Sequence, residues 1–217
     1  MTGYFLVSKA RKLIDPRLSQ NELISTCKMA LQAIDFPPGS DIDNAKNIAW
    51  LQACGFDGMR PLVREIQLHA KSQLVSSPKI CISNNVASFS GNPTSGLRIA
   101  MTVGDFAENY GAIEIEECTS PLIIVAELSR RKHLTNGFHI QWKENERVIS
   151  AKIQQGKFEF SWDIGHFDFA SSLRIDTINA LRIKENESIA SYYKHSLANG
   201  MEYEPSSWRI IQITANL

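Results

Sequence analysis

The sequence has no excess of charge of either sign, because 23 lysine and arginine residues balance 23 aspartate and glutamate residues in 217. A neutral chain creates no long-range field that concentrates phosphates, so nucleic acid and an anionic membrane are both disfavoured as partners. No apolar run approaches the roughly 20 residues of a transmembrane helix. These absences predict a soluble protein whose partner is a protein or a small molecule.

Cysteine is sparse, and the four cysteines form no Cys-x-x-Cys pair and have no histidine at zinc-finger spacing; they are Cys27, Cys54, Cys81 and Cys118. We therefore expect all four to be small buried residues in a reducing compartment, and no metal site.

The N-terminal Met1–Lys12 segment carries its charges after a short apolar stretch, the reverse of a signal peptide. A cytoplasmic location follows as an expectation.

Common catalytic motifs are also missing. The sequence contains no phosphate-binding G-x-x-x-x-G-K-[ST], no dinucleotide-binding G-x-G-x-x-G after a strand, no G-x-S-x-G and no H-E-x-x-H. The glycine-containing segment 91–96 is interpreted as a flexible loop, because no helix is expected to begin there. The cofactor is therefore unknown, and the sequence leaves open whether the protein is an enzyme.

Helical signals fill the N-terminal third of the chain. Ser19 and Glu22 form a capping box, and behind it Leu23, Cys27 and Leu31 recur on one helical face. A break at 36–40 precedes a second helix that closes at Gly55, and Pro61 opens a third. We predict an N-terminal helical segment over residues 1–75, formed by three helices.

From about residue 78 the apolar period changes from 3.6 to 2, which is typical of an antiparallel sheet with one buried face. The clearest alternation predicts a meander over residues 138–162, and shorter strands are predicted at 97–103, 113–116, 173–175, 181–183 and 208–214. Helices are predicted near 121–133, where a buried strand is the alternative, and near 187–198. The segment 83–95 is predicted to be a mobile loop. The fold class is α+β, with a sheet region over 76–217 that forms one unit with the helices.

Several short stretches resemble a bacterial family known only as a domain of unknown function. They are Leu18–Leu23, Gly55–Gly58, Ser120–Leu122 and Glu202–Ser207. Members of that family continue into a glycine- and alanine-rich tail, whereas this chain has the apolar segment 208–214. The resemblance implies a single folded unit and no particular activity.

The most suggestive polar cluster is Asp163, His166 and Asp168. A histidine between two carboxylates fits a general base held in one tautomer, and these three residues are the candidate catalytic group. The alternative is a polar turn between two strands, because aspartate and glycine favour turns for backbone reasons.

The run Arg130, Arg131 and Lys132 is the strongest local positive charge and the candidate anion site. The alternative is that these cations stabilise a helix C-terminus through its dipole. The second and third predicted helices also resemble a helix-turn-helix, in which Arg60, Arg64 or Lys71 would contact DNA.

The sequence does not establish a function. A non-catalytic binding or accessory protein is the first hypothesis. A small-molecule enzyme that uses Asp163, His166 and Asp168 is the second, and DNA binding by the N-terminal helices is the third. No substrate, ligand or partner is identified, because fold class alone does not imply activity.

Overall fold

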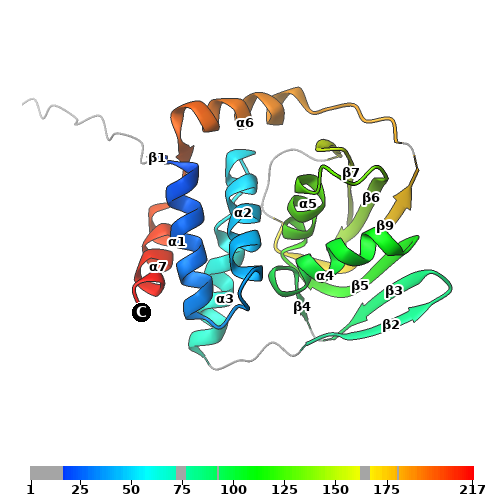
Figure 1. Cartoon of the computed structure of the whole chain (residues 1–217), viewed down its shortest axis with the longest axis horizontal. Helices are drawn as coiled ribbons and strands as arrows, with labels where there is room; N and C mark the ends of the chain where they lie inside the picture. Colours follow the sequence, from blue (N-terminus) through cyan, green and yellow to red (C-terminus); the bar gives the residue numbers. More distant parts are fainter. Residues whose placement is uncertain (1–16, 72–76, 92, 162–166, 180) are drawn as a thin grey trace, which may run out of the picture.

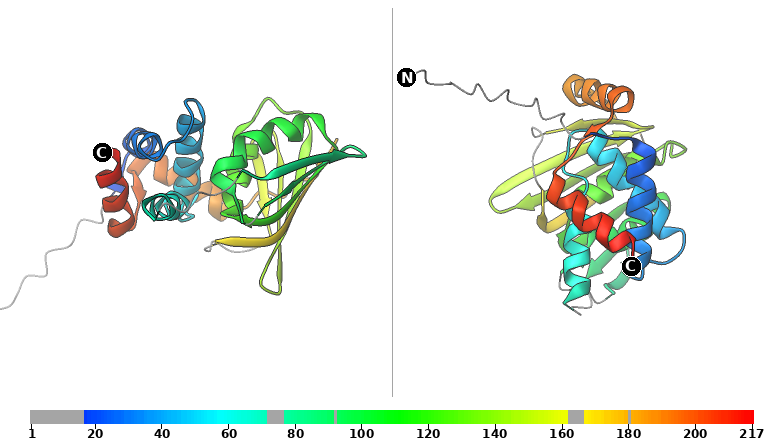
Figure 2. Two further views of the ribbon diagram at one scale, coloured as in Figure 1. Left: turned by 90° about the horizontal axis from the view of Figure 1, so that it is seen from below. Right: turned by 90° about the vertical axis from the view of Figure 1, so that its left-hand side faces the viewer.

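The structure is a computed structural model that describes residues 17–71, 77–91, 93–161, 167–179 and 181–217. The Met1–Lys12 segment, from which a cytoplasmic location was predicted, lies outside the described residues. The molecule has a helical layer on one side and a curved sheet on the other, with two further helices between them (Figures 1 and 2). None of the helices in the described part of the chain combines the length and apolar character that crossing a membrane requires.

The predicted N-terminal helices are confirmed as α1 (Gln20–Ala33), α2 (Ser40–Ala53) and α3 (Arg60–Ala70). The Ser19 hydroxyl accepts a hydrogen bond from the Glu22 backbone N–H at 3.2 Å, as the capping box predicted. The C-terminal helix α7 (Pro205–Ala215) returns to pack on α1 and α3. The helical layer therefore joins the two ends of the described chain.

The sheet is mixed and mostly antiparallel, as predicted. Its strand order is β2-β3-β5-β9-β6-β7-β8, with β3 and β5 parallel and the short β4 parallel to β5. The strands are β2 (Lys79–Ser83), β3 (Val86–Ser90), β4 (Thr94–Ser95), β5 (Ala112–Thr119), β6 (Gly137–Glu144), β7 (Arg147–Gln154), β8 (Lys157–Phe160) and β9 (Phe169–Ile178). The strands β1 (Arg17–Leu18) and β10 (Met201–Glu202) form a separate antiparallel pair. The predicted meander corresponds to β6, β7 and β8.

Helix α5 (Pro121–Arg130) lies between the helical layer and the sheet, and it contacts α2, α4, β7 and β9. Every residue from Pro121 to Ser129 is buried. This burial explains the continuous apolar run, from which the sequence alone could not decide between a helix and a buried strand. Helix α6 (Glu187–Asn199) was also predicted, and it crosses one edge of the molecule to reach α2 (Figure 1). The opposite face of the sheet exposes Glu114, Glu116 and Arg174 to solvent.

Three predicted strands are wrong. Segment 97–103 lies in helix α4 (Gly96–Asn109), where Leu97, Ala100 and Val103 are buried at helical spacing. Segment 208–214 lies in α7, which begins at Pro205 after Glu204 accepts hydrogen bonds from the backbone N–H groups of Ser206 and Ser207. Segment 181–183 forms no regular element. Short apolar runs satisfy both periods, so caps and proline decide between them.

Three further expectations are corrected. The predicted mobile loop 83–95 contains β3 and β4, and β3 is an inner strand of the sheet. Helix α4 begins directly after this segment, contrary to the expectation that no helix starts there. The buried carboxylate of Glu65 lies at the N-terminus of α4. It accepts hydrogen bonds from Ser95 and, at 3.1 Å, from Arg98. Cys81 is exposed, whereas the other three cysteines are buried as predicted.

Candidate functional site

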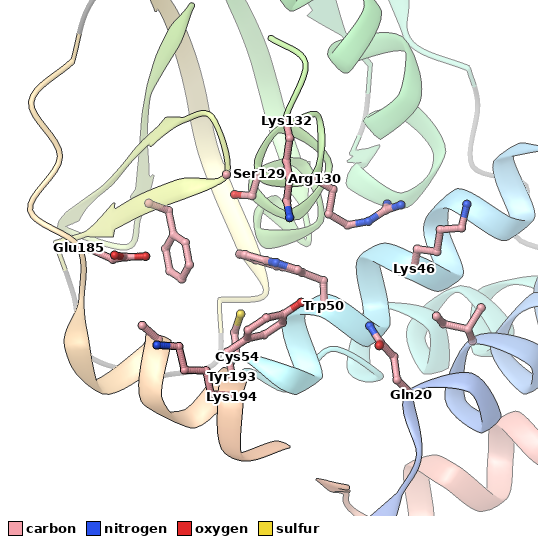
Figure 3. Close-up of a pocket in the computed structure, with 14 residues that line it drawn as sticks. Gln20, Lys46, Trp50, Cys54, Ser129, Arg130, Lys132, Glu185, Tyr193 and Lys194 are labelled. Carbon is pink, nitrogen blue, oxygen red and sulfur yellow. The ribbon is translucent and has the colours of Figure 1, made fainter. Parts of the chain in front are cut away.

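A cavity of about 490 Å³ opens between α1, α2, α5 and α6 (Figure 3). One wall is aromatic: the rings of Trp50 on α2 and Phe158 on β8 meet edge to face at 5.2 Å, and Tyr193 on α6 also lines the cavity. The size falls within the roughly 300–1,000 Å³ of small-molecule sites, which are typically lined by such side chains with a few polar groups. The walls come from five separate segments of the chain.

Four cations and one carboxylate complete the lining: Lys46, Arg130, Lys132, Lys194 and Glu185. Lys46 is partly neutralised by Asp43 at 3.2 Å. No ion pair of Lys132 or Lys194 occurs with any residue that the structure describes. Lys132 extends its ammonium group toward Trp50 in Figure 3. The cavity therefore has a net positive lining although the whole chain is neutral.

Arg130 is held in place by α2. Its guanidinium donates to Asn47 Oδ1 at 2.5 Å and to the Asp43 carbonyl at 3.1 Å. Burial lowers the pKa of Arg130, and the carboxylates of Glu127 and Asp43 oppose that change. Arg130 thus forms a fixed part of the wall and turns its charged end toward α2 (Figure 3).

Ser129 is a buried polar group of the cavity lining that lacks a partner among the described residues. Its side chain is 2% exposed, it lines the cavity, and its hydroxyl has no hydrogen-bond partner among the described residues. A buried hydroxyl without a partner costs about 1–3 kcal/mol, so most such groups in proteins are satisfied. Ser129 therefore identifies a position where a bound molecule gains a hydrogen bond.

The other ionisable groups in the cavity are held neutral. Burial raises the pKa of the Cys54 thiol far above its usual value. Burial also raises the pKa of the Tyr193 phenol, although Arg130 acts in the opposite direction. Neither side chain carries a negative charge that competes for the cations at neutral pH.

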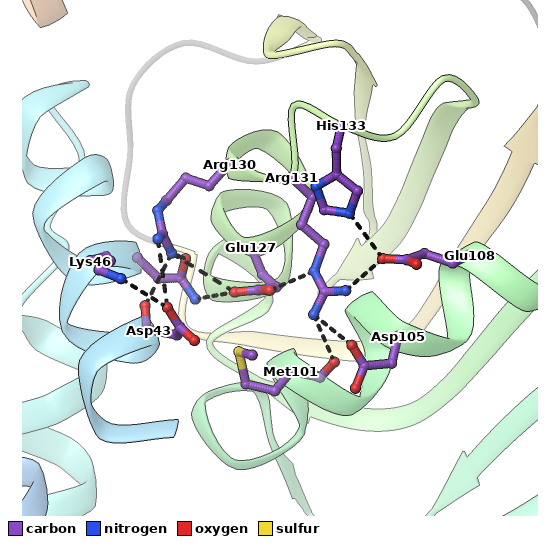
Figure 4. A network of polar contacts seen from close by, with 10 residues as sticks. Asp43, Lys46, Met101, Asp105, Glu108, Glu127, Arg130, Arg131 and His133 are labelled. Carbon is purple, nitrogen blue, oxygen red and sulfur yellow. Dashed lines mark hydrogen bonds and ion pairs between the residues drawn. The ribbon is translucent and has the colours of Figure 1, made fainter. Parts of the chain in front are cut away.

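A buried ionic network supports the end of α5 (Figure 4). Glu127 accepts hydrogen bonds from Asn47 at 2.9 Å and from Arg131 at 2.7 Å. Arg131 also contacts Asp105 and Glu108 on α4, both at 2.9 Å. Burial alone lowers the pKa of Arg131, but its hydrogen bonds with Glu127 and Asp105 outweigh burial, so the pKa is raised. The network ties α5 to α2 and α4.

The structure separates the three cations that the sequence analysis grouped as an anion site. Arg130 and Lys132 line the cavity, whereas Arg131 points away from it into the network with α4. The spacing explains this separation, because consecutive residues near a helix end point in different directions. Trp50, Ser129 and Tyr193 were not identified from the sequence, since no local motif connects them.

The candidate catalytic residues lie elsewhere. Asp163 and His166 fall outside the described residues. Asp168 forms an ion pair with Arg60 at 2.5 Å, and its carbonyl accepts from Arg64 at 3.5 Å, in a second cavity of about 600 Å³ beside α3 and α7. No cluster of three metal-ligating side chains occurs within the described ranges.

The contacts of Asp168 involve both arginines that the helix-turn-helix hypothesis assigns to DNA binding. Arg60 and Arg64 both contact Asp168, so two of the three cations of the helix-turn-helix hypothesis have a partner within the chain, although Arg60 remains exposed. Lys71 is exposed at the end of α3.

Residues 18–92 match the family model described as "Protein of unknown function (DUF3726)". This match confirms, over that range, the resemblance to a domain of unknown function. The chain has no significant match among curated protein sequences.

Similar folds occur among solved structures. The chain is similar to malate dehydrogenase from Pyrococcus horikoshii OT3, with a TM-score of 0.62, 8% identity, and 93% of this chain and 95% of the other covered. It is also similar to sulfolactate dehydrogenase from Methanocaldococcus jannaschii (TM-score 0.58, 10% identity, 93% and 97% covered). A third example is delta1-piperideine-2-carboxylate reductase from Pseudomonas syringae pvar. tomato (TM-score 0.55, 9% identity, 92% and 99% covered). At these identities the likeness establishes a shared fold and no shared activity.

Proposed function

We propose that the protein binds a small anionic metabolite in the cavity between α1, α2, α5 and α6, and that binding rather than catalysis is its role. The observation that carries the proposal is that two groups of the cavity lining lack a partner among the described residues: the buried hydroxyl of Ser129 and the ammonium group of Lys132. A carboxylate or phosphate oxygen accepts from both groups. Hydrogen bonds to a charged partner contribute about 1.5–3 kcal/mol each, more than neutral ones.

The aromatic wall defines the rest of the ligand. Trp50, Phe158 and Tyr193 present apolar surface next to the cations. A molecule with an apolar or planar body and an acidic group matches this division, and the volume of about 490 Å³ accommodates such a body. A bare inorganic ion uses only the polar end of the cavity and is expected to bind more weakly.

Binding is favoured over catalysis because the described lining lacks a group suited to proton transfer. A general base works best when its pKa lies near the operating pH. Burial raises the pKa values of Cys54 and Tyr193, and no histidine is among the described residues of the lining. Glu185 is exposed, so it is suited to solvent contact or to ligand selection by charge.

A carboxylate-converting enzyme is the second candidate function. The names of the three similar structures refer to malate, sulfolactate and piperideine-2-carboxylate, all of which are carboxylates. The likeness supports the choice of carboxylates as probes, and it leaves the catalytic residues unassigned. In that alternative Asp163, His166 and Asp168 remain the residues to test.

The experiment is a thermal-shift screen of carboxylate and phosphate metabolites, followed by calorimetric titration of those that raise the melting temperature. A ligand that binds only the folded state raises that temperature, and the shift increases with the logarithm of the ratio of ligand concentration to dissociation constant. The variant Lys132→Glu should weaken binding at least about tenfold, because a carboxylate replaces the ammonium group that faces the anion. Lys71→Glu, which makes the same change at an exposed position directly after α3, is the matched control and should leave affinity unchanged.

Two results would contradict the proposal. One is that no anionic compound stabilises the protein. The other is that Lys132→Glu and Lys71→Glu weaken binding equally, which indicates nonspecific attraction. Oxidation or reduction of a stabilising carboxylate by the protein would instead support the second candidate.

A further inference from the structure

The strand β2 forms an edge of the sheet that no other described strand covers, on a hairpin that extends away from the helical layer (Figure 1). All five residues of β2 are exposed, and Ile80 and Ile82 are 45% and 51% exposed. An edge strand presents unpaired N–H and C=O groups that invite another strand, and proteins usually protect it with charges, proline or bulges. β2 carries one charged residue, Lys79, at its end.

The hairpin register decides which backbone groups are free. Asn84 and Asn85 form a two-residue turn, both with positive φ, and Ser83 pairs with Val86 across it. Such a turn closes on a hydrogen-bonded pair, and hydrogen-bonded pairs then alternate along the ladder. Cys81 therefore directs its backbone toward β3, whereas Ile80 and Ile82 direct theirs outward from the sheet.

The side chains of β2 are symmetric about its centre. In the sequence Lys79-Ile80-Cys81-Ile82-Ser83, the two isoleucines flank Cys81. They lie opposite Phe89 and Ala87, which are buried, so the isoleucines extend the buried face of the sheet beyond its cover. A strand with this symmetry is complementary to itself in an antiparallel pair.

We propose that two copies of this chain associate through β2, antiparallel about a twofold axis at Cys81. Ile80 of each copy exchanges N–H···O bonds with Ile82 of the other. The four isoleucines then form one apolar cluster on the face that continues the core, and such cross-strand pairs stabilise sheets. Lys79 lies opposite Ser83 of the second copy, so the single charge of β2 meets no like charge. The interface is isologous, as in most homodimers.

The proposal places the two Cys81 residues in a non-hydrogen-bonded pair. The Cα atoms of such a pair are about 4.5 Å apart, which is within the range of about 4.4–6.8 Å that a disulfide spans. Treatment with diamide should therefore cross-link the native protein at Cys81. Two thiols lose two protons and two electrons, and diamide takes them up and becomes its hydrazine.

The experiment measures the mass of the full chain by light scattering across a concentration series. We expect a concentration-dependent approach to twice the 24.3 kDa chain mass. Ile82→Lys should raise the dissociation constant about tenfold or more, because lysine on an edge strand opposes pairing. Val148→Lys adds the same charge at an exposed position of β7, which is not adjacent to β2, and should leave association unchanged.

Cross-linking adds a readout of the register. Diamide should convert the wild-type protein into a covalent dimer, should do so far less in Ile82→Lys, and should fail in Cys81→Ser while that variant still dimerises. A monomeric mass at every concentration would overturn the proposal. So would association or cross-linking that is equal in Ile82→Lys and wild type, because another surface would then hold the copies together.

Discussion

Replacing Ser129 with alanine should change stability and ligand binding in opposite directions. Ser129 is 2% exposed on the most buried helix, α5, and its hydroxyl has no partner among the described residues. Removing a buried group that lacks a hydrogen bond relieves about 1–3 kcal/mol, and alanine also favours the helix. We therefore expect Ser129→Ala to raise the free energy of unfolding of the ligand-free protein by about 1–3 kcal/mol.

The same change should weaken binding of an anionic ligand. The lost hydrogen bond to a charged acceptor contributes about 1.5–3 kcal/mol, which corresponds to a loss of affinity of roughly 10- to 150-fold. Urea denaturation without ligand and calorimetric titration with it measure the two effects separately. For a chain of this size, each kcal/mol shifts the melting temperature by about 2–4 °C.

Ser95→Ala is the matched control. Ser95 is 4% exposed and donates to the buried carboxylate of Glu65, so its removal leaves that carboxylate with fewer partners and should destabilise the protein. If Ser129→Ala destabilises the ligand-free protein as Ser95→Ala does, the Ser129 hydroxyl has a partner and the reasoning fails. Unchanged ligand affinity in Ser129→Ala would refute it equally.

Three other substitutions test the surrounding structure. Glu127→Ala should reduce the free energy of unfolding by about 1–3 kcal/mol in urea denaturation, because Asn47 and Arg131 lose the buried carboxylate that accepts their hydrogen bonds, while Asp105 and Glu108 still pair with Arg131. Exposed Asp105→Ala should cost less than about 1 kcal/mol. Hydrogen bonds from Ser206 and Ser207 lower the pKa of Glu204 to about 2, so its stabilisation is present above its usual pKa near 4.5 and is lost as the pH falls toward 2. Glu204→Gln should therefore flatten the acid limb of a stability–pH profile, and an unchanged limb would contradict this assignment. Asp168→Asn should leave ligand affinity unchanged in calorimetry, because Asp168 lies in the second cavity, and a large loss would favour the enzyme hypothesis.

The sequence predicted those elements whose signals are local. The capping box at Ser19 and the helical spacing of Leu23, Cys27 and Leu31 agree, and α1 begins and packs accordingly. The two-residue alternation over 138–154 is long enough to exclude a helix, so β6 and β7 were also predicted. Extended agreement between local signals is what makes such elements predictable.

The wrongly predicted strands are short apolar runs whose spacing fits both the two-residue period of a strand and the 3.6-residue period of a helix. Leu97, Ile99 and Val103 alternate as in a strand, yet Leu97, Ala100 and Val103 also follow helical spacing, and burial against α5 and β5 selects the helix. Segment 208–214 was predicted as a strand although Pro205 indicates a helix start. Tertiary packing therefore determines the first outcome, whereas a local proline and cap determine the second.

The cavity was beyond sequence reasoning for a different reason. Trp50, Ser129, Phe158 and Tyr193 belong to four elements that only the fold brings together. The sequence did identify Arg130 and Lys132, because a run of cations is visible locally. It gave no indication that Arg131 points into a network with Asp105 and Glu108.

The most direct test of the central claim is a crystal structure of the protein with the carboxylate that stabilises it most in the thermal-shift screen. The proposal predicts that the carboxylate accepts from the Ser129 hydroxyl at about 2.7–2.8 Å and faces the Lys132 ammonium group, with the apolar body against Trp50. A ligand bound in the second cavity beside Asp168, or one that leaves the Ser129 hydroxyl without a partner, would contradict it.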